Sequence, residues 1–149
     1  MATVNVYLTF NGNCEEAFNF YKSVFGGDFS YVGRYKDMPK QDGCGEINDS
    51  DANKIMHIGL PISNETSIMG SDSPEQWASS YKEGNNFSLS VDVRSKEEAD
   101  RIFSGLSAGG HVTMPMQTTF WSAYFGMFTD KFGINWMVGY DEPSPTQPM

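Results

Sequence analysis

The sequence is poor in the residues that build metal and redox sites. Its 149 residues include two cysteines and two histidines. Cys14 and Cys44 form neither a CxxC pair nor a disulfide framework, which suits a reducing compartment. Neither has a histidine or another cysteine at the short spacing of a zinc site. We therefore expect two structural thiols.

Clustered positive charge and long apolar runs are also missing. Ten lysines and arginines face 19 aspartates and glutamates, for a formal net charge of -9. A phosphate-binding surface needs clustered basic residues, so this balance argues against nucleic acid and an anionic membrane as partners. The opening MATVNVYLTF has no basic segment before its apolar residues and soon turns polar. We expect neither a signal peptide nor a membrane span, and a cytoplasmic protein.

Aromatic residues are abundant, and they concentrate between residues 117 and 138. This segment, QTTFWSAYFGMFTDKFGINWMV, predicts a hairpin with strands over 122–129 and 134–138. In the connecting turn, Gly133 can take a positive φ, and we expect Asp130 to cap backbone donors. Large rings here either fill a sheet core or line an apolar cavity. They are Trp121, Tyr124, Phe125, Phe128, Phe132 and Trp136.

The first half of the chain predicts the order strand, helix, strand, strand, strand. Strands are expected over 4–10, 28–35, 54–62 and 66–69. Asn13 and Glu16 form an N-x-x-E variant of the capping box at the start of the helix. Apolar residues then recur at helical spacing until Gly26-Gly27.

The second half repeats this pattern. Cys14-Glu15-Glu16-Ala17 aligns with Lys96-Glu97-Glu98-Ala99 at an offset of about 82 residues, and both helices end on Gly-Gly. Ser95 and Glu98 form a second capping box. Strands over 87–93 and 111–119 and the aromatic hairpin complete another βαβββ order.

These elements predict an α+β fold in which two tandem βαβββ modules pair to form a cupped mixed β-sheet. We expect one domain, with module 1 over about 4–70, a connector over 71–86, module 2 over about 87–140 and a disordered tail over 141–149. A helical turn is possible at 74–81. The strand faces opposite the helices would line the cup, which is the candidate binding site.

Three segments carry a family resemblance: NGNCEEAFNFYKSVFGG, KIMHIGLPI and MQTTFWSAYFGMFTDKFGINWMV. Over about residues 4–140 the chain resembles the PhnB-like branch of the vicinal oxygen chelate superfamily, which also holds glyoxalase I, bleomycin-resistance proteins and extradiol dioxygenases. The resemblance implies the glyoxalase/bleomycin-resistance-like fold and a homodimer. This branch has often been labelled a ubiquinone-pathway methyltransferase. The sequence shows no Gly-rich loop with an acidic residue about 20 positions later, as a doubly wound nucleotide-binding unit would have.

The resemblance also implies where a divalent metal would bind. The histidine ligands of metal-using relatives fall on Val6 and Ser88, give or take one residue. The glutamate ligands fall near Met137 and, in the first half, on Ile68 or Met69. None of these side chains is a ligand of that kind. We therefore expect no cofactor, and a divalent metal is the disfavoured alternative.

Few polar residues remain that could carry chemistry. His57 lies mid-strand and aligns with Tyr124 when His-Ile-Gly-Leu is set against Tyr-Phe-Gly-Met. It either points into the cup as an acid, base or hydrogen-bond donor, or it is a hydrogen-bonded histidine in the sheet or facing solvent. His111 is expected at the surface. Gln117 either contacts a ligand or is solvated.

The leading hypothesis is a small-molecule-binding protein that holds an apolar or aromatic ligand without metal. The expected binding residues are Val6, Leu8, His57, Met69, Ser88, Gln117, Trp121, Tyr124, Trp136 and Met137. The alternative is a divalent-metal-dependent lyase, isomerase or dioxygenase-like enzyme whose non-standard ligand set includes His57. A third reading is a protein without a ligand, its cup closed by side chains.

Overall fold

The computed structural model describes residues 2–37 and 48–141 and contains two α-helices and eight strands there. The predicted disordered tail, apart from Asp141, and Cys44 lie outside the described residues. The helices are α1 (Cys14–Phe25) and α2 (Lys96–Ser107), at the predicted offset. The strands are β1 (Val6–Phe10), β2 (Tyr31–Arg34), β3 (Ile55–Pro61), β4 (Ser67–Asp72), β5 (Leu89–Val93), β6 (His111–Gln117), β7 (Tyr124–Thr129) and β8 (Asn135–Tyr140).

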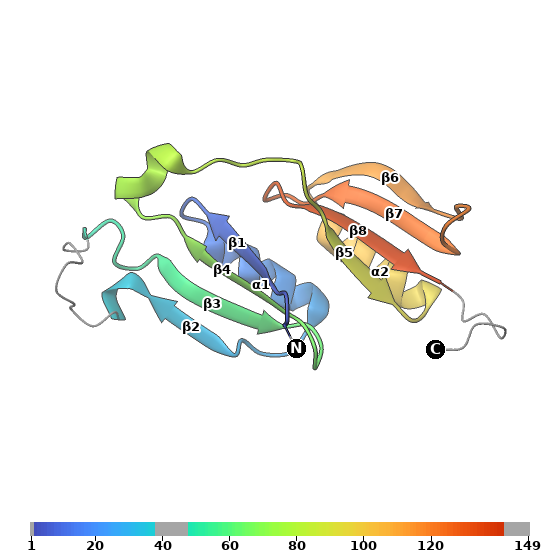
Figure 1. Cartoon of the computed structure of the whole chain (residues 1–149), viewed down its shortest axis with the longest axis horizontal. Helices are drawn as coiled ribbons and strands as arrows, with labels where there is room; N and C mark the ends of the chain where they lie inside the picture. The colour runs from blue at the N-terminus through green and yellow to red at the C-terminus, as the bar shows by residue number, and fades with distance from the viewer. Residues whose placement is uncertain (1, 38–47, 142–149) are drawn as a thin grey trace. The chain divides into compact units, whose positions relative to one another are not determined.

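The chain divides into two compact units, Met1–Lys82 and Glu83–Met149. Each unit holds a four-stranded sheet with one helix against it (Figure 1). The strand orders are β1-β4-β3-β2 and β5-β8-β7-β6; the first pair in each order is parallel and the other pairs are antiparallel. The predicted α+β fold of two βαβββ modules is confirmed. Two short 3-10 helices, Tyr35–Asp37 and Glu75–Ser80, lie in the connections, the second within the predicted 74–81 turn.

In the first unit, alternate strand residues pack against α1. Leu8 and Phe10 of β1 are buried, whereas Tyr7 and Thr9, which alternate with them, are exposed. Gly70 of β4 leaves room for the helix, since a Cβ there would lie 2.7 Å from the Phe18 ring. Helix residues that close this core include Ala17, Phe18 and Tyr21. The period-2 pattern of each strand therefore separates a core face from a face opposite the helix.

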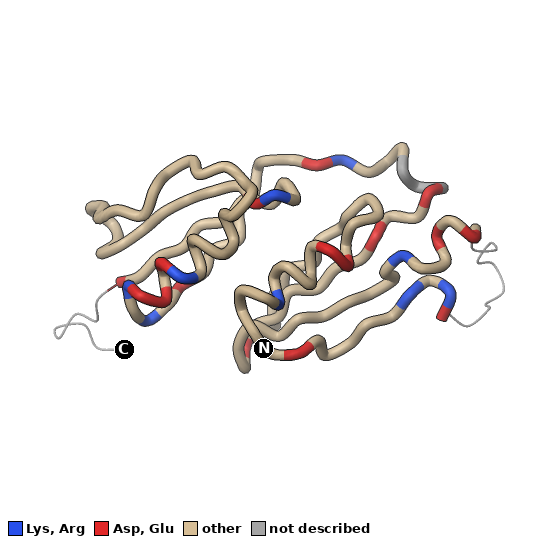
Figure 2. The backbone as a smooth tube through the Cα atoms, turned by 180° about the vertical axis from the view of Figure 1, so that it is seen from behind, with Lys and Arg blue, Asp and Glu red and all other residues tan. Residues whose placement is uncertain are grey.

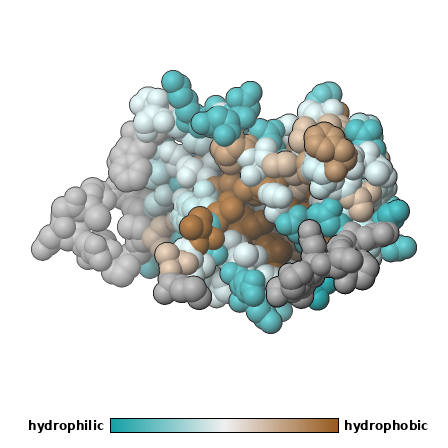
Figure 3. All heavy atoms as spheres, turned by 45° about the vertical axis from the view of Figure 1, so that its right-hand side comes forward, coloured by the Kyte–Doolittle hydropathy of each residue, from teal (hydrophilic) through white to brown (hydrophobic). Residues whose placement is uncertain are grey.

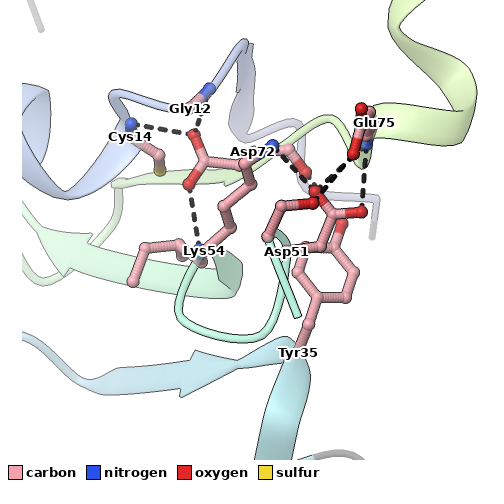
Figure 4. Close-up of polar contacts among 9 residues, drawn as sticks. Gly12, Cys14, Tyr35, Asp51, Lys54, Asp72 and Glu75 are labelled. Carbon is pink, nitrogen blue, oxygen red and sulfur yellow. Dashed lines mark hydrogen bonds and ion pairs between the residues drawn. The ribbon is translucent and has the colours of Figure 1, made fainter. Parts of the chain in front are cut away.

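The start of α1 is stabilised from a distant strand rather than by the predicted capping box. Asn13 makes no side-chain cap hydrogen bond, so that expectation is wrong. Instead Asp72 Oδ1 accepts from the backbone N–H groups of Gly12 and Cys14, each at 2.9 Å (Figure 4). Asp72 Oδ2 accepts from the N–H of Ile55, also at 2.9 Å. One buried carboxylate thus joins the helix N-terminus, β3 and β4.

A second buried carboxylate, Asp51, lies in the same region (Figure 4). Lys54 Nζ donates to its Oδ1 at 2.7 Å, and the Glu75 N–H lies 3.1 Å from Oδ2. The bond from Lys54 holds the pKa of Asp51 below its usual value. The Tyr35 hydroxyl donates to the carbonyl of Asp72 at 2.7 Å, and burial raises the pKa of Tyr35.

In the second unit, the structure confirms the helix cap and the turn that the sequence predicts. Ser95 caps α2 by accepting from the Glu98 N–H at 3.1 Å. In the β7–β8 turn Gly133 has φ +90°, and Asp130 Oδ1 accepts from the Phe132 and Ile134 N–H groups at 2.8 and 3.1 Å. Below the sheet, Phe103 of α2 meets Phe128 edge to face at 5.1 Å.

Charged residues avoid the sheets. Figure 2 shows Lys, Arg, Asp and Glu mostly on helices and connections, while the strands are almost entirely uncharged. The strand residues that carry charge are Arg34, Asp72 and Asp92. No helix in the described part of the chain is long and apolar enough to span a bilayer. A ligand on either sheet would meet aromatic, aliphatic, hydroxyl and amide groups.

Candidate functional site

The most chemically distinctive surface of the first unit is an aromatic cluster on the sheet face opposite α1. His57 of β3 lies between Tyr7 of β1 and Tyr31 of β2, with ring centroids 5.7 and 5.6 Å away. The Tyr7 hydroxyl lies 3.4 Å from His57 Nδ1. Tyr7 and Tyr31 remain 48% and 51% exposed. We call this surface, Tyr7, Tyr31, His57 and the half-buried Met69, the tyrosine face.

Strand register explains why these side chains meet. Tyr7 pairs with Met69, Met69 pairs with Gly59, and Gly59 pairs with Tyr31, so their Cβ positions share one face. The Tyr31 side chain lies over Gly33 of its own strand. This follows from the distance of 2.7 Å between the Tyr31 hydroxyl oxygen and a Cβ placed on Gly33. The absence of a side chain at Gly33 therefore permits this ring position.

The tyrosine face carries no fixed charge. Arg34 at the end of β2 is engaged by Glu15 of α1, at 2.6 Å between Nη2 and Oε2. This pairing lowers the pKa of Glu15 and raises the pKa of Arg34 through their hydrogen bond. The other charged strand residue of the unit, Asp72, is buried against the backbone of α1 and β3. The face therefore offers ring surface with two hydroxyls and an imidazole as its polar groups.

Two expected binding residues of the first unit lie on the α1 side of the sheet and not on the face opposite the helix. Leu8 is 3% exposed and faces α1. Val6, two residues earlier, shares that orientation and pairs with the buried Ile68. The prediction missed Tyr7, which lies between them. His57 and Met69 were predicted and are brought together on the tyrosine face.

In the second unit, Trp136 and Tyr124 also face the helix rather than an open surface. Trp136 is 2% exposed, and its Nε1 donates to Asp130 Oδ2 at 2.8 Å. The Tyr124 hydroxyl donates to Asp100 of α2 at 2.6 Å, which raises the pKa of Tyr124. The sequence alignment of His57 with Tyr124 thus pairs residues on different faces, because His57 lies opposite α1 whereas Tyr124 lies on the α2 side. An alignment that is shifted by one residue has this effect, since neighbouring strand residues point to opposite faces.

The remaining predicted residues lie on or beside the face opposite α2. Met137 pairs with Ser90 and Met127, and Gln117, at the end of β6, pairs with Phe125. Trp121 is 52% exposed beside Phe125, in edge-to-face contact at 5.5 Å. Ser88 is exposed one residue before β5. Figure 3 shows hydrophobic residues reaching the molecular surface among hydrophilic ones.

The positions that the resemblance assigns to metal ligands do not form a chelating set. Val6 and Ser88 offer no imidazole, and Met69 and Met137 offer no carboxylate. The recorded ring neighbours of His57 are Tyr7 and Tyr31. Within residues 2–37 and 48–141, no three His, Cys, Asp or Glu side chains lie close enough to hold a metal ion. Hard dications require oxygen and imidazole donors, so these residues do not fit such an ion.

Known proteins resemble the chain over nearly its whole length. Escherichia coli protein YjdN is 34% identical over 146 residues, covering 95% of this chain and 97% of its own. The crystal structure of protein PA1353 from Pseudomonas aeruginosa matches with TM-score 0.83 and 38% identity, covering 96% of this chain and all of that one (100%). A PhnB protein from Bacillus cereus matches with TM-score 0.72 and 27% identity, covering 93% and 99%.

More distant structures share the fold. A glyoxylase/bleomycin resistance protein/dioxygenase domain from Frankia matches with TM-score 0.65 at 16% identity over 95% of this chain and 98% of that one. The family model described as 3-demethylubiquinone-9 3-methyltransferase matches residues 2–139. The chain therefore belongs to that PhnB-like family and has the fold of the glyoxylase/bleomycin resistance/dioxygenase structures.

Proposed function

We propose that this protein binds a small, flat aromatic molecule on the tyrosine face, without a metal ion. The observation that carries the proposal is the placement of His57 between two tyrosine rings that stay about half exposed. Exposed aromatic rings gathered at one place mark interaction sites more often than scattered apolar residues do.

Ring stacking supplies the affinity in this proposal. An aromatic pair contributes about 0.5–1.5 kcal/mol beyond the burial of its area, so two tyrosines and an imidazole together can retain a flat ligand. The Tyr7 hydroxyl and His57 imidazole add hydrogen bonds that orient a hydroxyl or carbonyl substituent. Because no Lys, Arg, Asp or Glu belongs to the tyrosine face, a neutral aromatic ligand that covers it removes no fixed charge from water.

Two expectations accompany the proposal: the resemblance implies a homodimer, and two cysteines without a disulfide framework suit a cytoplasmic location. A native mass spectrum of protein purified without chelator tests the dimer and any co-purified ligand together. A metal-free dimer, bare or with an organic adduct, agrees with the proposal. One divalent ion per chain contradicts it and favours the alternative of a metal-dependent enzyme with an unplaced ligand set.

The binding proposal is tested with 2-naphthol as the probe and isothermal titration calorimetry as the measurement. Tyr7→Ala and Tyr31→Ala should each weaken binding about tenfold, which corresponds to about 1.4 kcal/mol. Adding a chelator should leave the affinity unchanged. Cyclohexanol, which has a hydroxyl but no aromatic ring, should bind much more weakly.

Tyr124→Phe is the matched control, because that ring lies on the α2 side of the second sheet and should not affect the titration. Circular dichroism establishes that each variant folds. If both tyrosine variants bind 2-naphthol like the unmodified protein, or if the chelator abolishes binding, the proposal is wrong.

A further inference from the structure

A pocket of about 530 Å³ lies in the second unit, beside the turn that joins β7 to β8. All of its lining residues belong to that unit. The side chains that matter for its chemistry are Asn85, Ser88, Thr113, Met127, Thr129 and Asn135. We call this cavity the hairpin pocket. Its volume falls within the range of about 300–1,000 Å³ that is typical of small-molecule sites.

The wall of the hairpin pocket depends on the backbone of the turn. Gly133 lines the pocket and has φ +90°, a conformation that other residues rarely adopt. A Cβ at this position would lie 3.2 Å from a carboxylate oxygen of Glu83. Gly84 and Asn85, in the segment before β5, also line the pocket, so this segment closes one side of the cavity.

The hydrogen-bonding groups of the pocket are neutral and partly pre-oriented. Thr129 Oγ1 donates to Asn135 Oδ1 at 2.6 Å. This bond uses the hydroxyl proton of Thr129 and fixes the amide of Asn135, whose NH₂ group remains a donor. Within the described part of the chain, no hydrogen bond engages the hydroxyls of Ser88 and Thr113. Both hydroxyls can donate to a ligand and accept from it.

The charge of the lining decides what class of ligand fits. No lining residue is charged, and β6, β7 and β8 carry no charged residue. An anionic ligand would find no cation to replace its hydration, and Glu83 near the wall would repel it. Met127 adds an adaptable apolar surface, and the aromatic residues Phe128 and Trp136 also line the pocket.

We propose that the hairpin pocket is a second binding site, for a neutral small molecule rich in hydroxyl or amide groups. The hydroxyls of Ser88 and Thr113 and the amide of Asn135 hydrogen-bond such a ligand, while Met127 contacts its carbon skeleton. This site lies in the second unit and does not depend on the tyrosine face. Its failure and the failure of the aromatic-binding proposal are therefore separate results.

The test compares two probes of similar size by NMR of the isotopically labelled full-length chain. N-acetylglucosamine is neutral and carries hydroxyl and amide groups, whereas glucuronate carries a carboxylate. The neutral probe should bind with a dissociation constant on the order of 1 mM and shift the amide signals of Thr129 and Asn135. Glucuronate should bind at least tenfold more weakly.

Two substitutions at the pocket have a matched control at Ser90 in β5, two residues after Ser88. Thr113→Val and Ser88→Ala remove hydroxyls and should each weaken N-acetylglucosamine binding several-fold. Ser90→Ala removes a hydroxyl two residues further along, outside the lining, and should leave binding unchanged. Absence of binding, equal binding of glucuronate, or shifts located away from Thr129 and Asn135 would each overturn the proposal.

Discussion

Trp136 Nε1 donates a hydrogen bond to Asp130 Oδ2 at 2.8 Å, and both residues are buried. The bond links a strand of the second sheet to the turn that precedes it. Buried indole N–H groups require an acceptor, and Asp130 supplies one without a ligand or water. This pair therefore explains how the largest ring of the hairpin can be buried with its polar N–H group satisfied.

The first prediction concerns Asp130. Its carboxylate accepts from the N–H groups of Phe132 and Ile134 as well as from Trp136, so Asp130→Ala leaves one buried and two partly buried donors without this acceptor. We expect the free energy of unfolding to fall by about 3 kcal/mol, measured by urea denaturation. Asp92→Ala, at an exposed position of β5, is the control and should change it by less than about 0.5 kcal/mol. Equal losses in the two variants would contradict the anchoring role of Asp130.

The second prediction is a pH dependence from Asp51. Its folded pKa lies below the unfolded value of about 3.9, chiefly because Lys54 donates to it. The unfolded state therefore takes up the proton first as pH falls, so the stabilisation is complete above about pH 4 and is lost as pH passes the folded pKa. Asp51→Asn should be less stable than the unmodified protein at pH 7, and this gap should shrink at lower pH.

Urea denaturation of both proteins at several pH values measures this gap. Glu97→Gln, on an exposed residue of α2, is the control and should give no comparable pH-dependent gap. A gap for Asp51→Asn that stays constant down to acidic pH would show that the carboxylate charge is not the source of the stabilisation.

The sequence predicts the order of elements because that order depends on local signals. Helical spacing of apolar residues, the Ser95 cap and the Gly133 turn all act within a few residues. The cap of α1 could not be predicted in this way. Asp72, which supplies it, is separated from Cys14 by 58 residues.

The expected site and the structure differ mainly in which face of a strand each side chain occupies. Leu8 and Tyr7 differ by one position, and that position decides whether a side chain meets α1 or the tyrosine face. The alternation of Leu8 and Phe10 with Tyr7 and Thr9 contained the signal that would have identified Tyr7. Tyr31 gives a weaker signal, because β2 is short and its ring position depends on Gly33.

The third prediction concerns the hydroxyl of Tyr124. Its hydrogen bond to Asp100 raises its folded pKa above the unfolded value of about 10. The bond therefore contributes fully below the unfolded pKa and is lost as pH rises through the folded pKa. In an alkaline absorbance titration, the difference between the unmodified protein and Tyr124→Phe should show one phenol ionising above pH 10. Asp100→Asn should move this transition back toward pH 10, and no movement would contradict the assigned cause.

The last prediction separates the shape of the tyrosine face from the stability of the fold. A Cβ on Gly33 would lie 2.7 Å from the hydroxyl oxygen and 2.8 Å from a ring carbon of Tyr31. Tyr31 is half exposed, so its ring can move away at little energetic cost. Gly33→Ala should therefore change the free energy of unfolding by less than about 1 kcal/mol while weakening 2-naphthol binding as much as Tyr31→Ala does. In the double variant, the second substitution should add little, because both changes remove the same ring contact. Fully additive losses would mean that the two residues affect binding separately and that the ring position over Gly33 does not determine affinity.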